Sequence, residues 1–180
     1  YKADTVPVGQ DQLPHLELAR EIARRFNNLY GTVFPEPHAL VTEVPVLPGI
    51  DGRKMSKSYG NAINISDPPD LIRRKVRSMF TDPRRIYRTD PGHPEECPVC
   101  FYHRVYTAQE HEEVARQCRG AEIGCVDCKA KLAENIISAL EPIQQKRAEL
   151  EKKPGKVQEI LNAGCRKGAE VAEKTVAEVR

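Results

Sequence analysis

The sequence predicts an α/β protein in which part of a parallel-sheet domain is followed by an all-helical domain. Three observations predict this architecture. A β-branched run at residues 5–8 leads into a helical pattern, a second β-rich run covers residues 39–47, and only helical patterns follow residue 80. The expected organisation is an α/β part at 1–80, a helical domain at 81–164 and a terminal helix at 165–180 that packs back.

Glycine and proline positions set the limits of the first strand and helix. The strand at 5–8 ends at Gly9, and apolar residues then recur at helical spacing. These apolar residues are Leu18, Ile22 and Phe26. Pro14 is tolerated only in the first helical turn, so the helix is expected to begin near Asp11. Residues 10–12 therefore lie between a strand end and a helix start, where open parallel sheets place their ligand crevice.

Two further elements complete the expected α/β part. A strand is expected from Ala39 to Leu47, followed by a turn at Asp51–Gly52. Asp67 before Pro68 is typical of an N-cap followed by proline at the first helical position. This helix is expected to run to Phe80. Its inward residues are expected to be Leu71, Ile72, Val76 and Met79.

The rest of the chain has helical spacing. The helices expected first cover 102–106, 109–117 and 129–153. Pro154–Gly155 is expected to end the third of these, and Gly164 to divide the remainder into two shorter segments.

The composition excludes a disordered chain and a membrane-spanning one. Hydrophobic residues make up 39% of the chain and charged residues 30%, with a net charge of only +2. That balance lacks the single-sign excess that keeps chains disordered. No apolar stretch approaches the roughly 18 residues that cross a bilayer. Because the chain begins at Tyr1 and shows no secretory signal pattern, we expect it to be a piece of a longer protein.

Positive charge is concentrated in residues 72–88, which we call the basic segment. It holds seven basic residues against one acidic residue, Asp82, and therefore has a charge of +6. An excess of this kind suits a polyanion such as an RNA backbone. The alternative is a solvated helix face, and the residues alone leave both interpretations open.

Lys54 and Lys57 lie three residues apart between Gly52 and Gly60, in a segment with two serines. No GxxxxGK[ST] phosphate loop occurs in the chain. A flexible loop with two ammonium groups can close over a triphosphate and neutralise the charge that moves to a leaving pyrophosphate. The alternative interpretation is a solvated basic turn.

The string from Lys54 to Ser58 reads KMSKS, the signature of class I aminoacyl-tRNA synthetases. Upstream, the segments at 1–4 and 6–12, followed by His15, Glu17, Arg20 and Phe26-Asn27, resemble bacterial tryptophanyl-tRNA synthetases. The resemblance covers essentially the whole chain, which looks like the carboxyl-terminal part of such an enzyme. The family's HIGH-type motif does not occur in the sequence. The resemblance implies that 1–80 is part of a class I Rossmann-like catalytic domain and 81–164 an anticodon-binding domain.

The resemblance also implies roles for individual residues. Lys54 and Lys57 look like the catalytic lysines that stabilise the transition state of adenylate formation. The implied ATP-binding residues are Gly9, Gln10, Asp11, Val46, Lys54, Met55, Ser56, Lys57 and Ser58. Within this set Asp11 resembles the acid that accepts hydrogen bonds from the ribose, and Leu47 is an alternative to Val46. The implied tryptophan-binding residues are Gln12, Val6 and Val8.

Five of the six cysteines lie between Cys97 and Cys128, which favours a metal over disulfides. Spacing alone leaves two alternatives. Two CxxC pairs predict zinc, whereas a CxxxxxxCxxC run with one upstream cysteine predicts a [4Fe–4S] cluster. The pairs are Cys97 with Cys100 and Cys125 with Cys128. The chain resembles the subgroup of tryptophanyl-tRNA synthetases with an iron–sulfur cluster, which implies the ligands Cys97, Cys118, Cys125 and Cys128.

The resemblance implies activation of L-tryptophan with ATP and Mg²⁺ and transfer to tRNA(Trp), by a cytoplasmic homodimer without membrane contact. Two other functions are weighed against it. One is a non-catalytic zinc-binding RNA module in which KMSKS is a relic. The other is the sister tyrosine enzyme, against which the cysteines and the string at 7–12 argue.

Overall fold

The computed structural model of the chain describes residues 1–41 and 46–180. The chain forms two compact units, Tyr1–Pro45 with Leu150–Arg180, and Val46–Glu149. Each unit is considered by itself. None of the helices in the described ranges is both long enough and apolar enough to span a bilayer.

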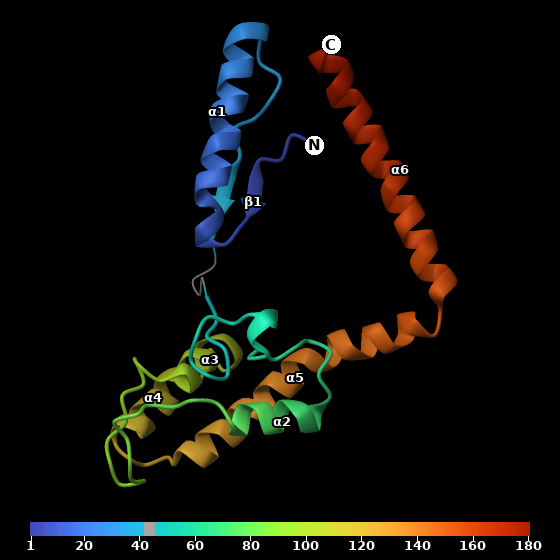
Figure 1. Cartoon of the computed structure of the whole chain (residues 1–180). Helices are drawn as coiled ribbons and strands as arrows, with labels where there is room; N and C mark the ends of the chain where they lie inside the picture. The colour runs from blue at the N-terminus through green and yellow to red at the C-terminus, as the bar shows by residue number, and fades with distance from the viewer. Residues whose placement is uncertain (42–45) are drawn as a thin grey trace. The chain divides into compact units, whose positions relative to one another are not determined.

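A two-stranded parallel sheet and one helix form the amino-terminal part of the first unit (Figure 1). Strand β1 (Thr5–Pro7) pairs with β2 (His38–Leu40), with Val6 opposite Ala39. The turn η1 (Gln10–Gln12) then leads into α1 (Leu13–Tyr30), whose first turn contains Pro14. The expected order of strand, tight turn and helix is therefore confirmed.

The second predicted strand is only partly confirmed. β2 covers the start of the expected range, residues 42–45 lie outside the described residues, and Val46 and Leu47 belong to no strand. Pro48 follows them, and it lacks the N–H that a ladder requires. It forms only an isolated antiparallel bridge with Lys54.

An asparagine closes the carboxyl end of α1. The side-chain oxygen of Asn27 accepts hydrogen bonds from the backbone N–H of Val33 at 2.9 Å and of Phe34 at 3.0 Å. Its amide donates to the Phe34 carbonyl at 2.7 Å. Gly31 lies between them with φ = 101°, which a residue with a Cβ rarely adopts.

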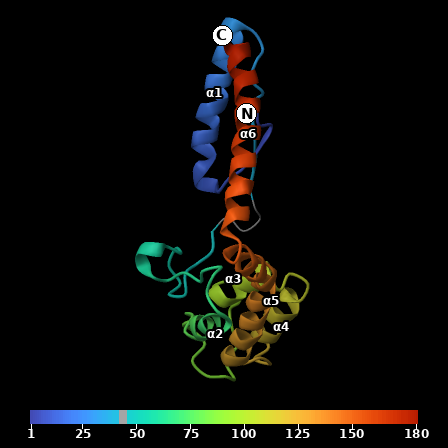
Figure 2. The same ribbon diagram turned by 90° about the vertical axis from the view of Figure 1, so that its right-hand side faces the viewer.

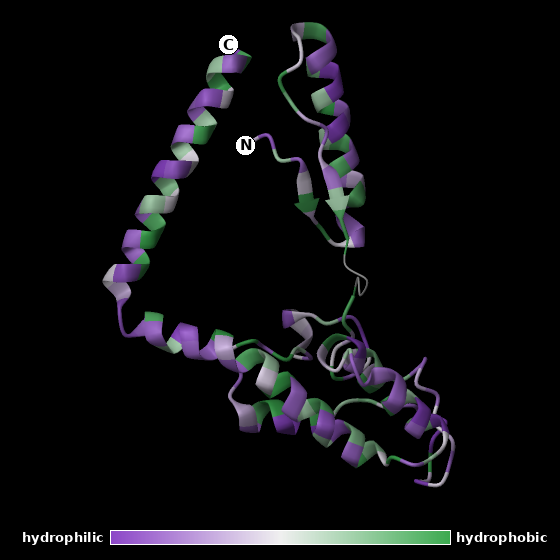
Figure 3. Ribbon diagram, turned by 180° about the vertical axis from the view of Figure 1, so that it is seen from behind, coloured by the Kyte–Doolittle hydropathy of each residue, from purple (hydrophilic) through white to green (hydrophobic). Residues whose placement is uncertain are grey.

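The first unit also contains α6 (Pro154–Val179), and this helix corrects one prediction. It continues through Gly164, where a break was expected. A single glycine costs only about 1 kcal/mol relative to alanine inside a helix, and its neighbours here include several good helix formers. Hydrophilic and hydrophobic residues alternate along α6 (Figure 3), and none of its residues is buried.

Four helices of the second unit surround one hydrophobic core (Figure 2). They are α2 (Pro69–Arg77), α3 (Pro98–Tyr106), α4 (His111–Arg119) and α5 (Cys125–Glu151). Its largest fully buried side chains are Tyr102, Ile72, Met79, Leu132, Ile136, His103, Val76, Val99 and Val114. The predicted inward face of α2 is confirmed for Ile72, Val76 and Met79, whereas Leu71 is only half-buried.

The predicted cap of α2 was wrong. Pro68 is the N-cap, and the Asp67 carboxylate turns back to accept a hydrogen bond from the Asn64 N–H at 2.9 Å. Asp67 also pairs with the Lys75 ammonium at 2.5 Å. The helix ends at Arg77 instead of Phe80. Because Lys75 reaches this buried carboxylate, it does not project outward with the other basic residues of α2.

Candidate functional site

The segment Lys54–Ser58, which we call the two-lysine loop, is an exposed turn in the second unit. The helical turn η2 (Lys57–Tyr59) begins within it, and the Ser56 hydroxyl accepts a hydrogen bond from the Ser58 N–H at 3.2 Å. Gly60 ends the turn with φ = 63°. Both lysine side chains are exposed, so their ammonium groups can reach a ligand outside the protein.

Asn61 anchors this loop from behind. The residue is only 2% exposed, and its side-chain oxygen accepts a hydrogen bond from the Ser56 N–H at 2.8 Å. Its amide nitrogen donates to the Asp51 carboxylate at 2.8 Å and to the Lys54 carbonyl at 3.1 Å. The Asn61 hydrogen bond, together with those from Arg53, lowers the pKa of Asp51. One buried amide therefore fixes the backbone that carries both lysines.

The base of the loop is joined to the hydrophobic core. The Tyr102 hydroxyl donates to the Pro48 carbonyl at 2.6 Å, and Met55 packs against the core. A Cβ on Gly49 would lie 2.2 Å from the Asn61 amide nitrogen, so only glycine fits there. The lysines thus project from a rigid base.

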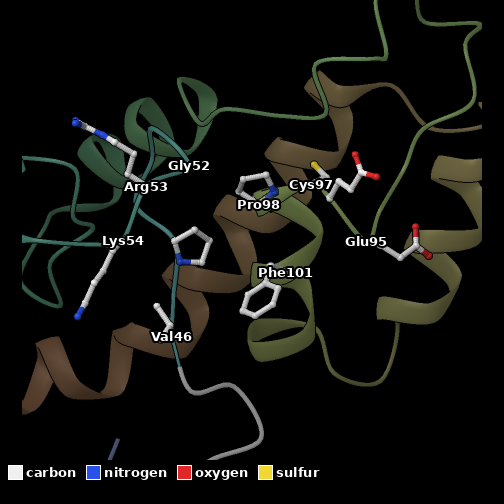
Figure 4. A pocket seen from close by; sticks show the side chains of 10 residues that line it. Val46, Gly52, Arg53, Lys54, Glu95, Cys97, Pro98 and Phe101 are labelled. Atoms are coloured by element: carbon white, nitrogen blue, oxygen red, sulfur yellow. The ribbon is translucent and has the colours of Figure 1, made fainter. Parts of the chain in front are cut away.

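A hollow of about 350 Å³ lies beside the loop (Figure 4). It brings together two of the expected ATP-binding residues, Val46 and Lys54. Pro98 and Phe101 of α3 line the opposite wall. Val46 is half exposed and offers an apolar surface, whereas the Lys54 side chain is directed away from Pro98 and Phe101 (Figure 4).

The other expected ligand contacts lie in the first unit, at the junction of β1 and η1. Gln10, Asp11 and Gln12 are exposed, and Val6 and Val8 are half-buried. The Gln12 amide donates to the Asp11 carboxylate at 3.1 Å. A Cβ on Gly9 would lie 2.7 Å from the Asp11 carboxylate oxygen, so glycine allows this acid its position.

The five clustered cysteines border one small cavity in the second unit, together with Arg85, Thr81, Val99 and Ile123. Cys97, Cys100, Cys118 and Cys128 are buried, and Cys125 is half-buried. The Cys100 thiol lies in hydrogen-bonding contact with the other three buried thiols. Cys165 is exposed on α6, away from this group in sequence.

The hydrogen bonds of Cys100 act on the pKa of the three neighbouring thiols. The hydrogen bonds shared with Cys100 lower the pKa of Cys97, Cys118 and Cys128, while they raise that of Cys100. His103 also contacts the Cys128 sulfur, at 3.4 Å from Nε2.

Arg85 supplies a positive charge to the same cavity. Its Nη1 lies 3.8 Å from the Cys118 sulfur, and its Nη2 donates to the carbonyls of Arg88 at 2.7 Å and Ile123 at 2.9 Å. Two backbone carbonyls therefore hold this guanidinium beside the thiols. The arrangement compensates negative charge on the sulfur atoms.

The donor set suits a thiophilic metal centre, because five thiols and no carboxylate line the cavity. However, across residues 1–41 and 46–180 no three Cys, His, Asp or Glu side chains are arranged as a ready-made metal site. The thiols that touch one another include Cys100, whereas the expected ligand set included Cys125. The expected metal ligands therefore remain a prediction.

Three positioning residues were missed by the sequence analysis. Asn61 follows Gly60 and therefore reads as an ordinary turn residue. Nothing in the sequence distinguishes His103 or Arg85 from the other polar residues near them. Arg85 was counted only as a member of the basic segment. A signal was available for Asn61 alone, because it comes directly after the KMSKS string and its closing glycine.

The family model for tRNA synthetases class I (W and Y) matches residues 1–141. The chain therefore belongs to this family. Its short parallel sheet, its helices and the KMSKS loop agree with the class I synthetase fold.

Among the proteins similar to this chain are several tryptophan–tRNA ligases. The tryptophan–tRNA ligase of Aquifex aeolicus is 52% identical over all of this chain and 46% of its own length. That of Thermotoga maritima is 50% identical over all of this chain and 56% of its own. The crystal structure of Campylobacter jejuni tryptophanyl-tRNA synthetase complexed with ADP and tryptophan matches 99% of this chain and 56% of that one. Its TM-score is 0.76 at 31% identity. The chain thus spans about half the length of these relatives.

Proposed function

We propose that this chain is the carboxyl-terminal part of a tryptophan–tRNA ligase. The enzyme would join L-tryptophan to ATP, release pyrophosphate and pass the aminoacyl group to tRNA(Trp). The observation that carries the proposal is the KMSKS loop, held from behind by the buried Asn61 so that Lys54 and Lys57 face outward. The identity to tryptophan–tRNA ligases over the whole chain supports it.

In the proposed reaction, Lys54 and Lys57 stabilise negative charge on the phosphates as the carboxylate of tryptophan attacks the α-phosphorus and pyrophosphate leaves. Lysine suits this task as a compact charge on a long stem. ATP enters with Mg²⁺, which shares the charge of the phosphates. Met55, Ser56 and Ser58 belong to the same loop, and Val46 lies on the apolar wall beside Lys54.

The β1–η1 junction supplies the other proposed contacts. Asp11 accepts hydrogen bonds from the ribose hydroxyls, because a carboxylate is an acceptor only. The backbone of Gly9 and Gln10 contacts the nucleotide. Gln12, Val6 and Val8 contact tryptophan. Support comes from the exposure of 10–12 and from the close approach of Asp11 to Gly9.

The domain division and partners are part of the proposal. Residues 1–80 form part of the Rossmann-like catalytic domain, 81–164 bind the anticodon, and 165–180, which contain the second half of α6, pack back. The protein acts as a homodimer in the cytoplasm. The basic segment, with three exposed arginines on α2, supports contact with tRNA.

For the cysteines we propose a [4Fe–4S] cluster, with zinc as the alternative. Cys118, Cys125 and Cys128 would be joined by Cys97, or by Cys100 in its place. The contact of Cys100 with three other thiols supports its candidacy. When bound, the group would brace the helices around it, and Arg85 would offset its negative charge. Metal analysis after anaerobic purification is expected to give iron and sulfide, whereas zinc without sulfide would favour the alternative.

The proposed activity is tested with the full-length polypeptide. Tryptophan should drive exchange of labelled pyrophosphate into ATP without tRNA, and tyrosine should not. Tryptophan should then be transferred to tRNA(Trp). Exchange with tyrosine would identify the sister enzyme, and tRNA binding without any exchange would favour the non-catalytic RNA module.

A further inference from the structure

A second hollow, of about 360 Å³, lies between α2 and the first turns of α5, within the second unit. We call it the α2–α5 groove. Its floor consists of Val126, Ala130 and Ala133, and its rim of Arg73, Arg77 and Lys129, with Glu134 at the Arg73 side. It uses none of the residues assigned above to ATP, tryptophan or a metal.

The floor of the groove is apolar and shallow. Val126, Ala130 and Ala133 follow one another at i, i+4 and i+7, so they form one stripe along α5. Val126 is 72% exposed, although valine is normally among the buried residues. The alanines leave room above them for a flat ring.

The cations of the rim differ in how they are paired. Arg73 is held by Glu134 at 2.8 Å and by Asp70 at 3.0 Å, so its charge is already compensated. The Lys129 ammonium donates to the Arg77 backbone carbonyl at 3.1 Å, which compensates no charge. In the described part of the chain neither Lys129 nor Arg77 forms an ion pair with a carboxylate. Two uncompensated cations therefore meet at one edge of the apolar floor.

This combination fits a ligand in which an anionic group adjoins a flat apolar ring, which is the chemistry of a nucleotide. We propose that the groove takes one unstacked nucleotide of an RNA strand. The base lies over Val126 and Ala130, and the backbone phosphate meets Arg77 and Lys129. Proteins that recognise single-stranded RNA commonly bind bases that are splayed out of the stack. The inference rests on the proposed function, which brings RNA to this protein.

A strand of RNA fits better than a free mononucleotide. Arg74 and Arg88 are exposed members of the same basic segment outside the groove, so positive charge continues beyond it. The first turn of α5 adds the positive end of a helix dipole near Val126, in the same turn as the carboxylate of Asp127. The neighbouring phosphates of a strand are attracted by these additional charges, whereas a single nucleotide gains nothing from them.

The test measures the affinity of the full-length protein for tRNA(Trp) at several salt concentrations. Arg77→Gln and Lys129→Gln should each weaken binding about 5-fold and reduce the slope of log affinity against log salt by about 0.7, as loss of one phosphate contact predicts. Ala130→Phe fills the floor without changing charge. It should weaken binding about 10-fold with an unchanged slope, since a stacked base contributes about 1–3 kcal/mol.

Two exposed positions on the same helix provide matched controls. Lys146→Gln removes a charge and Ala139→Phe adds a ring, both outside the groove, and both should leave tRNA affinity within about twofold. Tryptophan-dependent pyrophosphate exchange without tRNA should be unchanged in every variant. A wild-type protein without exchange would refute the proposed function, independently of the tRNA affinities.

The inference fails if the groove variants bind tRNA as tightly as the controls, or if the wild-type protein does not bind it. It also fails if adenosine or cytidine monophosphate binds the wild-type protein and not Ala130→Phe, while tRNA affinity stays the same. That result would assign the groove to a free nucleotide.

Discussion

At the scale of single residues, the two lysines depend on a group that the motif does not contain. Lys54 and Lys57 supply charge, but Asn61 sets the backbone from which they project, through hydrogen bonds to Ser56 and Lys54. The chemical role and the positioning role therefore belong to different residues. They can be separated by mutation.

Replacing either lysine should slow the activation step. In the full-length protein, Lys54→Ala or Lys57→Ala should reduce tryptophan-dependent pyrophosphate exchange by about 10²-fold or more, as other transition-state donors do. Tryptophan affinity should hardly change, because the side chains act on phosphate. Equilibrium binding of tryptophan separates the two effects, and an unchanged exchange rate would refute the assigned role.

Asn61→Ala should impair the same step indirectly. It leaves the Ser56 N–H without its acceptor, which costs about 1–3 kcal/mol if the loop keeps its conformation. We expect the loop to open, with slower exchange and greater sensitivity of the Lys54–Lys57 peptide bonds to protease. Asn162→Ala, an exposed asparagine on α6, is the control. Normal exchange with normal protease resistance would show that Asn61 is dispensable.

At the scale of elements, the sequence predicted what depends on neighbours along the chain. The β1 strand, α1 and the inward face of α2 follow from local spacing, and KMSKS is a contiguous string. The contact of Asp67 with Lys75 and the contacts of Cys100 with Cys118 and Cys128 form only in the folded chain. Local spacing carries no information about such partners.

Gly164 is a position where a local signal predicted a helix end that the structure does not have. A glycine signals a helix end only when its neighbours do not favour the helix, and here the helix formers of α6 continue past it.

The spacing of the cysteines could not reduce the metal ligands to one set. Both CxxC pairs and the CxxxxxxCxxC run occur in the same 32 residues, Cys97–Cys128.

The turn between α4 and α5 contains a residue with a strained backbone conformation, and a glycine there should relieve the strain. Ala121 has φ = 56°, in the left-handed region that costs a residue with a Cβ about 1–2 kcal/mol, whereas Gly120 before it has φ = −80°. Ala121→Gly should therefore raise the free energy of unfolding by about 1 kcal/mol, measured by denaturant titration. Gly120→Ala serves as the comparison and should not stabilise the protein. A destabilised Ala121→Gly would show that the turn is not strained.

At the scale of the whole molecule, two buried carboxylates make the stability of the second unit depend on pH. Burial opposes ionisation of Asp67 and Asp82, but hydrogen bonds from Lys75 and Asn64 to the former, and from His93 and Arg84 to the latter, lower the pKa of each. A lowered folded-state pKa contributes stability above the unfolded value of about 3.9. That contribution is lost as pH falls through the folded-state pKa.

The free energy of unfolding should accordingly stay level from about pH 7 to pH 5 and decline below about pH 4. Asp82→Asn should lower it at pH 7 by about 1–3 kcal/mol, because three donors lose a charged acceptor, and should flatten the acid decline. Urea titrations across this range provide the measurement. A variant with the same acid decline as the wild type would exclude Asp82 as its source.

The proposed reaction requires the two lysine side chains to lie at the phosphates during tryptophan activation. The most direct measurement is a crystal structure of the full-length protein with a non-hydrolysable analogue of tryptophanyl-adenylate and pyrophosphate. We predict that the ammonium groups of Lys54 and Lys57 lie within hydrogen-bonding distance of phosphate oxygens, while Asn61 keeps its contacts to Ser56 and Lys54. Both ammonium groups directed into solvent, with the ligand bound elsewhere, would contradict the role proposed for Lys54 and Lys57.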